Sequence, residues 1–336
     1  MARVNFEKLI EYWDPVLRKA FLDSVQNIRQ RAQLDQIAKA IERGDLNAAL
    51  EAVGLDPASF RPLDITIQRI YEVGGNATAS ALPALGKLDS GLRVSFIFNM
   101  RNPTAERWIN EHSSIKVTEI ITDQRVMIRE FLTEGLKLGA NPRTTALDLV
   151  GRVGQNGLRQ GGMLGLTSSQ AAWVRNYGDK LANGDMSALG SALRDKRYDK
   201  LVSRTFEKGD KLSPSQINSM VNAYKNRALR YRAETISRTE TMASLHEAQQ
   251  QAMDQVVQSG KLRSDNVSFT WRSAHDNRTR DTHREMDGQT VKMGEMFVSP
   301  SGARLEYPGD PNGPAAEVIN CRCWREPNVN FLAGIK

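Results

Sequence analysis

The chain has 336 residues, of which 40% are hydrophobic and only two are cysteine. This length allows two or three folded domains, and so few cysteines exclude the small proteins whose fold depends on several disulfides. No apolar run reaches the roughly 18–20 residues that cross a bilayer, and the N-terminal segment lacks the apolar stretch of a signal peptide. We therefore expect a protein that is made and first works in a cytoplasm, with no membrane partner.

Positive charge is concentrated in one stretch of the chain. The net charge is +7, and residues 140–232 hold 16 Lys and Arg against 7 Asp and Glu, whereas residues 1–139 hold 18 basic and 18 acidic residues. A local surplus of this kind suits a surface that faces the phosphates of a nucleic acid, although a solvated helical face has the same composition. The candidate nucleic-acid contacts are Arg194, Lys196, Arg197, Lys200, Arg204 and Lys208.

The first region, residues 1–104, mixes element types. Apolar residues recur at helical spacing from Leu17 to Ile41, which predicts an amphipathic helix that ends before Gly44. A short helix and a turn are expected over residues 46–63. The stretch "SGLRVSFIFN" is rich in β-forming residues, and it predicts a strand over residues 91–99 that would belong to a small inserted sheet.

The second region, residues 105–260, has the pattern of several helices. Two amphipathic segments are separated at "GANP", where Gly139 is suited to end one helix and Pro142 to begin the next. The glycines of "GRVGQNGLRQGGMLG" fit neither the dinucleotide-binding nor the Walker spacing, so we expect a flexible loop between helices there.

Two helix starts in this region carry a capping-box spacing. Thr167 with Gln170, and Ser213 with Gln216, place a hydroxyl three residues before a side-chain amide. The segment that begins at Ser213 continues to Gly260 and predicts either one long helix or two helices with a bend.

After Gly260 short β-type runs alternate with turn residues. The whole pattern predicts an α+β fold: a mostly α-helical N-terminal and central region with a small inserted sheet, followed by a small irregular α+β C-terminal domain. We expect domains at residues 1–104, 105–260 and 261–336. A domain as small as the last one often needs a metal or a partner surface for stability.

Both cysteines lie in this last domain, as Cys321 and Cys323. Residues two apart on a strand point to the same face, so the two sulfurs could bind one zinc ion, with His283 and Asp276 as further candidate ligands. The alternative is that the thiols fill a core and His283 donates a hydrogen bond.

The segment "DNRTRDTHREMDG" permits a second interpretation. Asp276, Arg278, Arg280 and His283 would converge if a turn leads into one helical turn here. Such a cluster is either an active site or a polar brace for an irregular domain. We favour the brace, because no set of nucleophile, base and orienting residue can be identified.

Three motifs in order give residues 225–326 a family resemblance: "RAETISRTET", then "WRSAHDNRTRDTHREMDG", then "LEYPGDPNGPAAEVINCRC". This part of the chain resembles the phage Mu F-like family, the minor head or head morphogenesis proteins of tailed phages. Residues 1–100 show no comparable likeness. The motif residues that carry the resemblance are Trp271, Arg278, Thr279, Arg280, Asp287, Gly288, Tyr307, Pro308, Gly309, Asn320, Arg322, Arg238 and Glu240.

The resemblance implies a non-enzymatic protein of the virion head, present in few copies, which associates with the portal during procapsid assembly. Portal, capsid or scaffolding proteins and packaged double-stranded DNA would be its partners. It would lie in the head interior, after assembly in the host cytoplasm, and could be ejected with the DNA. Ser237, His246 and His275 depart from the expected pattern. The departure at His275 argues against this residue as a ligand and leaves His283, Cys321 and Cys323 as the better metal ligands.

Two other functions fit the same residues. One is a metal-dependent hydrolase or nuclease that acts on DNA through His283, Asp276 and a bound metal. The other is a nonspecific DNA-binding protein, whose affinity would fall steeply with salt. Thiolate ligands favour a structural zinc site, whereas magnesium-dependent nucleases use carboxylates.

Overall fold

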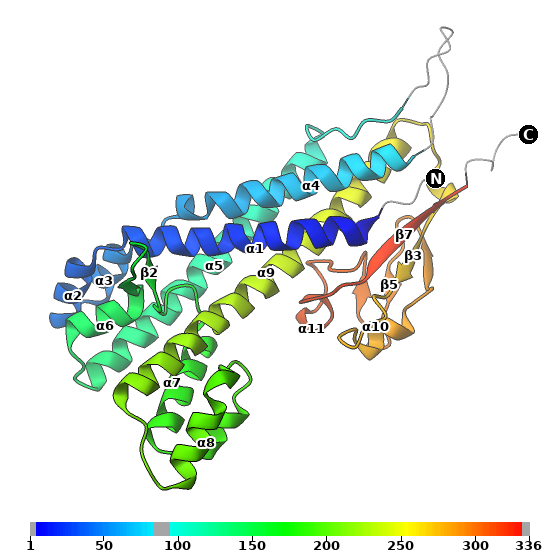
Figure 1. Ribbon diagram of the computed structural model, residues 1–336. Coiled ribbons are helices and arrows are strands. Elements are labelled where there is room, and N and C mark those ends of the chain that lie inside the picture. Colours follow the sequence, from blue (N-terminus) through cyan, green and yellow to red (C-terminus); the bar gives the residue numbers. More distant parts are fainter. Residues whose placement is uncertain (1–4, 83–94, 331–336) are drawn as a thin grey trace, which may run out of the picture. The chain divides into compact units, whose positions relative to one another are not determined.

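A computed structural model describes residues 5–82 and 95–330 (Figure 1). The described residues form two compact units. Unit 1 draws on the segments Met1–Ala20, Leu63–Ser114 and Glu234–Lys336, and unit 2 on Phe21–Pro62 and Ile115–Ala233. The domain boundaries expected at 104/105 and 260/261 differ from this division and stay predictions.

The predicted helix up to Gly44 is two helices, α1 (Phe6–Arg31) and α2 (Leu34–Glu42). Gln33 lies between them in a non-helical conformation, and its backbone N–H donates 2.9 Å to the carbonyl of Ala52 on α3 (Leu46–Val53). The apolar period runs through this break because Val25 and Ile28 on one side and Ile37 and Ile41 on the other are all buried. Periodicity alone therefore could not reveal the break.

Helices η1 (Pro57–Phe60), α4 (Arg61–Ala81) and α5 (Pro103–Lys137) continue the chain. The strand predicted over 91–99 is not formed in its described part, residues 95–99, and residues 91–94 lie outside the described residues. The backbone N–H and C=O of Asn99 bond instead to the side-chain amide of Gln255, at 2.9 and 3.1 Å. Phe98 is buried against Tyr71, so this β-rich segment serves the core of unit 1 without joining a sheet.

Unit 2 is built from helices and one small hairpin. The "GANP" break is confirmed, because α6 (Pro142–Val150) begins five residues after α5 ends. The glycine-rich segment is not a plain loop: β1 (Arg152–Val153) pairs with β2 (Arg159–Gln160). A Cβ on Gly151, whose φ is +93°, would lie 2.7 Å from the carbonyl oxygen of Gln160. The remaining elements up to residue 207 are α7 (Ser168–Ala182), η2 (Met186–Gly190), η3 (Lys196–Tyr198) and α8 (Asp199–Glu207).

Both predicted capping boxes are confirmed. Thr167 and Gln170 exchange backbone-to-side-chain hydrogen bonds at the start of α7, and Ser213 and Gln216 do the same at the start of α9. Helix α9 (Pro214–Gln258) is a single helix of 45 residues, which decides between the two alternatives for this segment. Helices α1, α5 and α9 each contribute residues to both units.

The C-terminal part of unit 1 holds most of the strands. A three-stranded antiparallel sheet has the order β4-β3-β7, and β5 pairs with β6. Its core packs Phe269, Trp271 and Phe297 with Met253 and Val256 of α9. The fold is therefore α+β and mostly helical, as predicted. The elements are η4 (Ser264–Asn266), β3 (Val267–Arg272), α10 (Asp281–Glu285), β4 (Thr290–Lys292), β5 (Phe297–Val298), β6 (Arg304–Leu305), α11 (Ala315–Val318) and β7 (Trp324–Val329).

Among residues 5–82 and 95–330, the helices are either too short or too polar to span a bilayer.

Candidate metal centre and basic helix face

A turn followed by one helical turn positions His283. The carboxylate of Asp276 accepts hydrogen bonds from the backbone N–H of Arg278 (3.0 Å) and the hydroxyl of Thr279 (2.9 Å), which closes the turn before α10. Helix α10 then directs His283 inward, where its ring meets the indole of Trp271 edge-on at 5.2 Å between centroids. The imidazole is buried, although Asp281, Arg284 and Glu285 of the same helix are exposed.

Both cysteine sulfurs point to the same nitrogen of this imidazole. The Sγ atoms of Cys321 and Cys323 lie 3.6 and 3.4 Å from His283 Nδ1. The two cysteines precede β7 rather than lying within it. All three side chains are buried, at 1% exposure each, and their donor atoms lie within 4.8 Å of one another, so they could hold a metal ion.

Asp276, the fourth expected ligand, lies outside this donor set. Besides closing the turn before α10, its carboxylate accepts a hydrogen bond from the guanidinium of Arg322, the residue between the two cysteines. Arg322 thus faces away from the sulfurs of its neighbours toward Asp276. The sequence neighbourhood of Asp276 and His283 suggested a common target, but Asp276 is used to brace the turn.

Glu317, which sequence reasoning missed, approaches the other side of the imidazole. Its Oε2 lies 2.9 Å from His283 Nε2, an ion-pair distance without the alignment of a hydrogen bond. Burial would raise the pKa of Glu317, but hydrogen bonds from Ser301 and Thr282 outweigh it and hold this pKa below its ordinary value. The carboxylate is thus kept ionised beside the ring. An acidic residue in "GPAAEVINC" carries no sequence signal for this position.

The two thiols affect each other's ionisation. The side-chain hydrogen bond from Cys323 lowers the pKa of Cys321, and the same contact raises the pKa of Cys323. Of the two thiols, Cys321 therefore loses its proton first. A cation at this point would favour loss of both protons.

The segment that carries the cysteines is fixed to α9 on both sides. The backbone N–H of Asn320, whose φ is +59°, donates to the hydroxyl oxygen of Thr239 at 3.1 Å. Arg325, the second residue of β7, donates from Nε to Gln249 Oε1 at 3.0 Å. The three motifs of the sequence therefore meet here, since α9, the α10 turn and the Asn-Cys-Arg-Cys segment contact one another within unit 1.

The other motif residues serve the same framework. Tyr307 donates its hydroxyl to Glu247 at 2.8 Å, Asp287 accepts from the backbone N–H of Ser273 at 2.7 Å, and Glu240 lies 2.7 Å from His112. Trp271 and Pro308 are buried, and Gly288 donates its backbone N–H to the Trp271 carbonyl. Gly309 lies against Met242. The guanidinium of Arg280 donates to the carbonyl of Ile319, and Arg238 forms an ion pair with Asp14.

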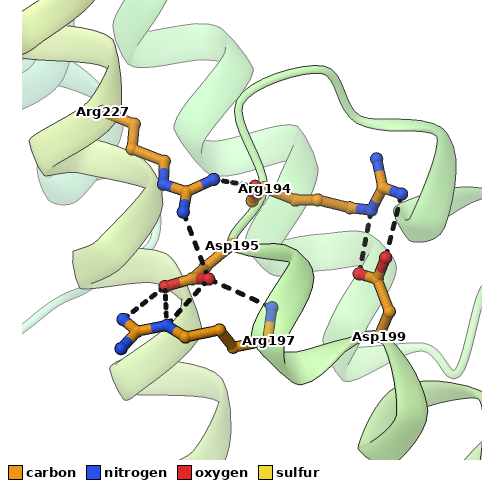
Figure 2. A network of polar contacts seen from close by, with 5 residues as sticks. All are labelled: Arg194, Asp195, Arg197, Asp199 and Arg227. Carbon is orange, nitrogen blue, oxygen red and sulfur yellow. Dashed lines mark hydrogen bonds and ion pairs between the residues drawn. The ribbon is translucent and has the colours of Figure 1, made fainter.

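The six predicted nucleic-acid contacts, in unit 2, divide into two groups. Arg194 forms a bidentate ion pair with Asp199, in which each of the two hydrogen bonds is 3.0 Å long (Figure 2). Asp195 forms ion pairs with both Arg197 and Arg227. These pairs neutralise the charge of Arg194 and Arg197. The other four are exposed and have no acidic partner among the described residues: Lys196, Lys200, Arg204 and Lys208. They recur every fourth residue along η3, α8 and its C-cap, and we call them the basic row.

Comparison with known proteins identifies the C-terminal part of the chain. Residues 200–325 match the family model described as phage Mu protein F like protein, and the match spans α9, the His-Cys-Cys cluster and the motif residues around it. Comparisons with curated proteins and with solved structures gave no significant match. The match ends at Arg325, just after the second cysteine, and covers the region in which the three motifs meet. Residues 200–325 are therefore similar to phage Mu F-like proteins.

Proposed function

We propose that this chain is a minor head protein of a tailed phage that acts in head morphogenesis. In this proposal it associates with the portal during procapsid assembly, alongside capsid or scaffolding proteins. It is made in the host cytoplasm, becomes part of the virion, and faces packaged double-stranded DNA in the head interior. Its role is structural rather than catalytic.

The family match carries the proposal. It covers residues 200–325, which include the whole of α9 and most of the sheet that packs on it. The motif residues Trp271, His283 and Arg325 of this region are each at most 1% exposed, so they make contacts inside the protein and do not line an open cleft. A framework of this kind suits a protein that is built into an assembly.

The basic row supports a position against DNA. Its members are spaced by four residues, which along an α-helix corresponds to about 6 Å per step. Lys200 and Arg204 therefore lie about 6 Å apart along α8. Lys196 on η3 and Lys208 at the C-cap of α8 extend the row on either side of them. Each Lys or Arg that neutralises a DNA phosphate releases a counterion, so such a row gives affinity without sequence preference.

The hydrolase or nuclease alternative has less support. The donor set at the cluster consists of two sulfurs and one nitrogen, and no carboxylate joins it among the described residues. Magnesium-dependent nucleases require oxygen ligands. The buried position of His283 also gives a DNA strand no access to it.

The proposal is tested in the phage that encodes the chain. A nonsense mutation in its gene should reduce the yield of infectious particles and give defective heads by electron microscopy, and the wild-type chain supplied from a plasmid should restore both. Normal heads and titres without the chain would contradict a role in head morphogenesis. Portal association is tested separately by copurification of the tagged chain with the portal protein from the same phage, with the major capsid protein alone as the control.

A further inference from the structure

We propose that His283, Cys321 and Cys323 bind one zinc ion through the imidazole Nδ1 and the two thiolate sulfurs, with the fourth position taken by a water molecule. The ligands come from α10 and from the segment just before β7. The site is a structural centre of unit 1 and goes beyond the role in head assembly.

The distances already match a tetrahedral zinc site. Zinc binds thiolate sulfur at about 2.3 Å and imidazole nitrogen at about 2.0 Å, which places tetrahedral S and N ligands about 3.5 Å apart. The observed separations between His283 Nδ1 and the two sulfurs are 3.6 and 3.4 Å. Both nitrogen–sulfur separations therefore fit a zinc ion, and all three donor atoms lie within 4.8 Å of one another.

Packing alone satisfies this arrangement poorly. One imidazole nitrogen has either a single proton to donate or a single lone pair to accept, yet two buried sulfurs point at Nδ1. Sulfur is a weak hydrogen-bonding partner in either direction. A cation at the common point of the three atoms uses all three lone pairs at once.

The surroundings of the imidazole fit a metal ligand. A zinc-bound histidine usually presents its second ring nitrogen to a carboxylate or a carbonyl, which fixes the ring and the tautomer. Here Nε2 faces Oε2 of Glu317, which also accepts a hydrogen bond from the hydroxyl of Thr282 at 3.0 Å. The second carboxylate oxygen, Oε1, accepts a hydrogen bond from the hydroxyl of Ser301 at 2.6 Å. With the proton on Nε2 beside this carboxylate, Nδ1 has its lone pair free for the ion.

The donor types select the metal. Two thiolates and an imidazole favour zinc over calcium and magnesium, which prefer oxygen ligands. Among the described residues no fourth His, Cys, Asp or Glu joins the set, so the last position is left to a non-protein ligand. The resulting centre ties α10 to the Asn-Cys-Arg-Cys segment, which Asn320 and Arg325 hold against α9.

The first measurement is the zinc content of the purified full chain, produced with zinc in the medium and kept reduced. We expect about one zinc per chain. After exchange for Co²⁺ we expect thiolate-to-cobalt charge-transfer absorption. Cys321→Ser and Cys323→Ser should each lose stoichiometric zinc and weaken that absorption. Glu317→Gln should retain the ligands but lower the zinc affinity by about 10–100-fold.

His275 provides a matched control for His283. It lies in the same motif, its side chain is mostly exposed, and it is not part of the donor set. His275→Ala should keep full zinc content, whereas His283→Ala should lose it. If the His283 and cysteine variants fail to fold, the wild-type chain still decides: a chelator should lower its melting temperature, and zinc but not magnesium should restore it.

A folded wild-type chain that contains no zinc and shows no cobalt charge-transfer absorption on titration would overturn the proposal, as would equal zinc content in wild type and both cysteine variants. These outcomes concern the centre alone. A protein without zinc could still be a head component, and a zinc protein could be absent from the virion, so this test and the phage experiment fail independently.

Discussion

Arg325 of β7 and Gln249 of α9 are joined inside the core of unit 1 by a 3.0 Å hydrogen bond from Nε to Oε1. The guanidinium also lies over the ring of Phe269, 4.1 Å from its centroid, and bonds to the carbonyl of His246. Burial lowers the pKa of Arg325 to about 10, so it stays protonated at pH 7. The contact between the sheet and α9 therefore includes a buried cation, in addition to the apolar packing.

Replacing this cation should destabilise the protein strongly. Arg325→Ala leaves the buried acceptors on α9 unsatisfied and removes the contact with Phe269, so we expect a loss of about 3–5 kcal/mol. Urea unfolding of the full chain measures it. Arg304→Ala, which removes an exposed arginine from the neighbouring strand β6, should change stability by less than about 0.5 kcal/mol. Equal losses of stability from the two substitutions would show that the buried contacts of Arg325 contribute no more to stability than an exposed arginine does.

Gly309 lies in the "YPGD" turn, where it meets α9 closely. Its φ is +83°, and an added Cβ would lie 3.0 Å from the Cβ of Met242. Gly302 has nearly the same φ, +84°, but open space around it. Gly302→Ala should therefore cost about 1 kcal/mol for the backbone conformation alone, and Gly309→Ala about 1–2 kcal/mol more. Thermal unfolding of both variants checks this difference, and an equal loss would exclude a tight contact at Gly309.

Asp195 gives unit 2 a predicted dependence on acid. Hydrogen bonds from Arg197, followed by the charge of Arg227, lower the pKa of Asp195 to about 2. A depressed pKa means that the stabilisation is present above the unfolded value of 3.8 and is lost as the pH falls toward 2. Asp195→Asn keeps an oxygen that can cap η3 but removes the charge that pairs with Arg197 and Arg227, so it should cost about 1 kcal/mol at pH 7.

The measurement for Asp195 is urea unfolding of wild type and variant at several pH values. The two stabilities should converge as the pH is lowered from 4 to 2. Asp210→Asn, at an exposed acid of the same unit, should follow the wild type throughout. A gap between Asp195→Asn and wild type that stays constant down to pH 2 would contradict the ion pairs shown in Figure 2.

The basic row predicts a salt-dependent affinity for double-stranded DNA. Replacing Lys200 and Arg204 with Gln should reduce the slope of log K against log salt by about 2, because each phosphate contact contributes about 0.9. Lys39 and Arg43 form the matched control: they are also a Lys and an Arg four residues apart, exposed and in unit 2. Fluorescence anisotropy with a DNA duplex measures both pairs. Equal effects would assign the binding to net charge rather than to the row.

Local signals in the sequence predicted several elements correctly. The capping boxes at Thr167 and Ser213 and the break at "GANP" depend on residues within a few positions of one another, so they can be identified without the fold. The break at Gln33 and the path of residues 95–99 depend on partners far away in the chain, Ala52 and Gln255. Such partners cannot be read from periodicity or β-propensity.

The candidate site was also predicted only in part. Cysteine and histidine are rare in this chain, so Cys321, Cys323 and His283 stood out, and the structure brings them together. Acidic residues are common, and nothing distinguished Glu317, which faces the imidazole, from Asp276, which bonds to Arg322. Likewise, composition marked the basic stretch but could not show that Asp199 and Asp195 neutralise Arg194 and Arg197.

The proposed role in the phage head is tested most directly by quantitative peptide mass spectrometry of purified procapsids and mature virions, with the copy number scaled to the major capsid protein. A minor head protein should be present in both at few copies per particle. Absence of the chain from both particles would contradict the account.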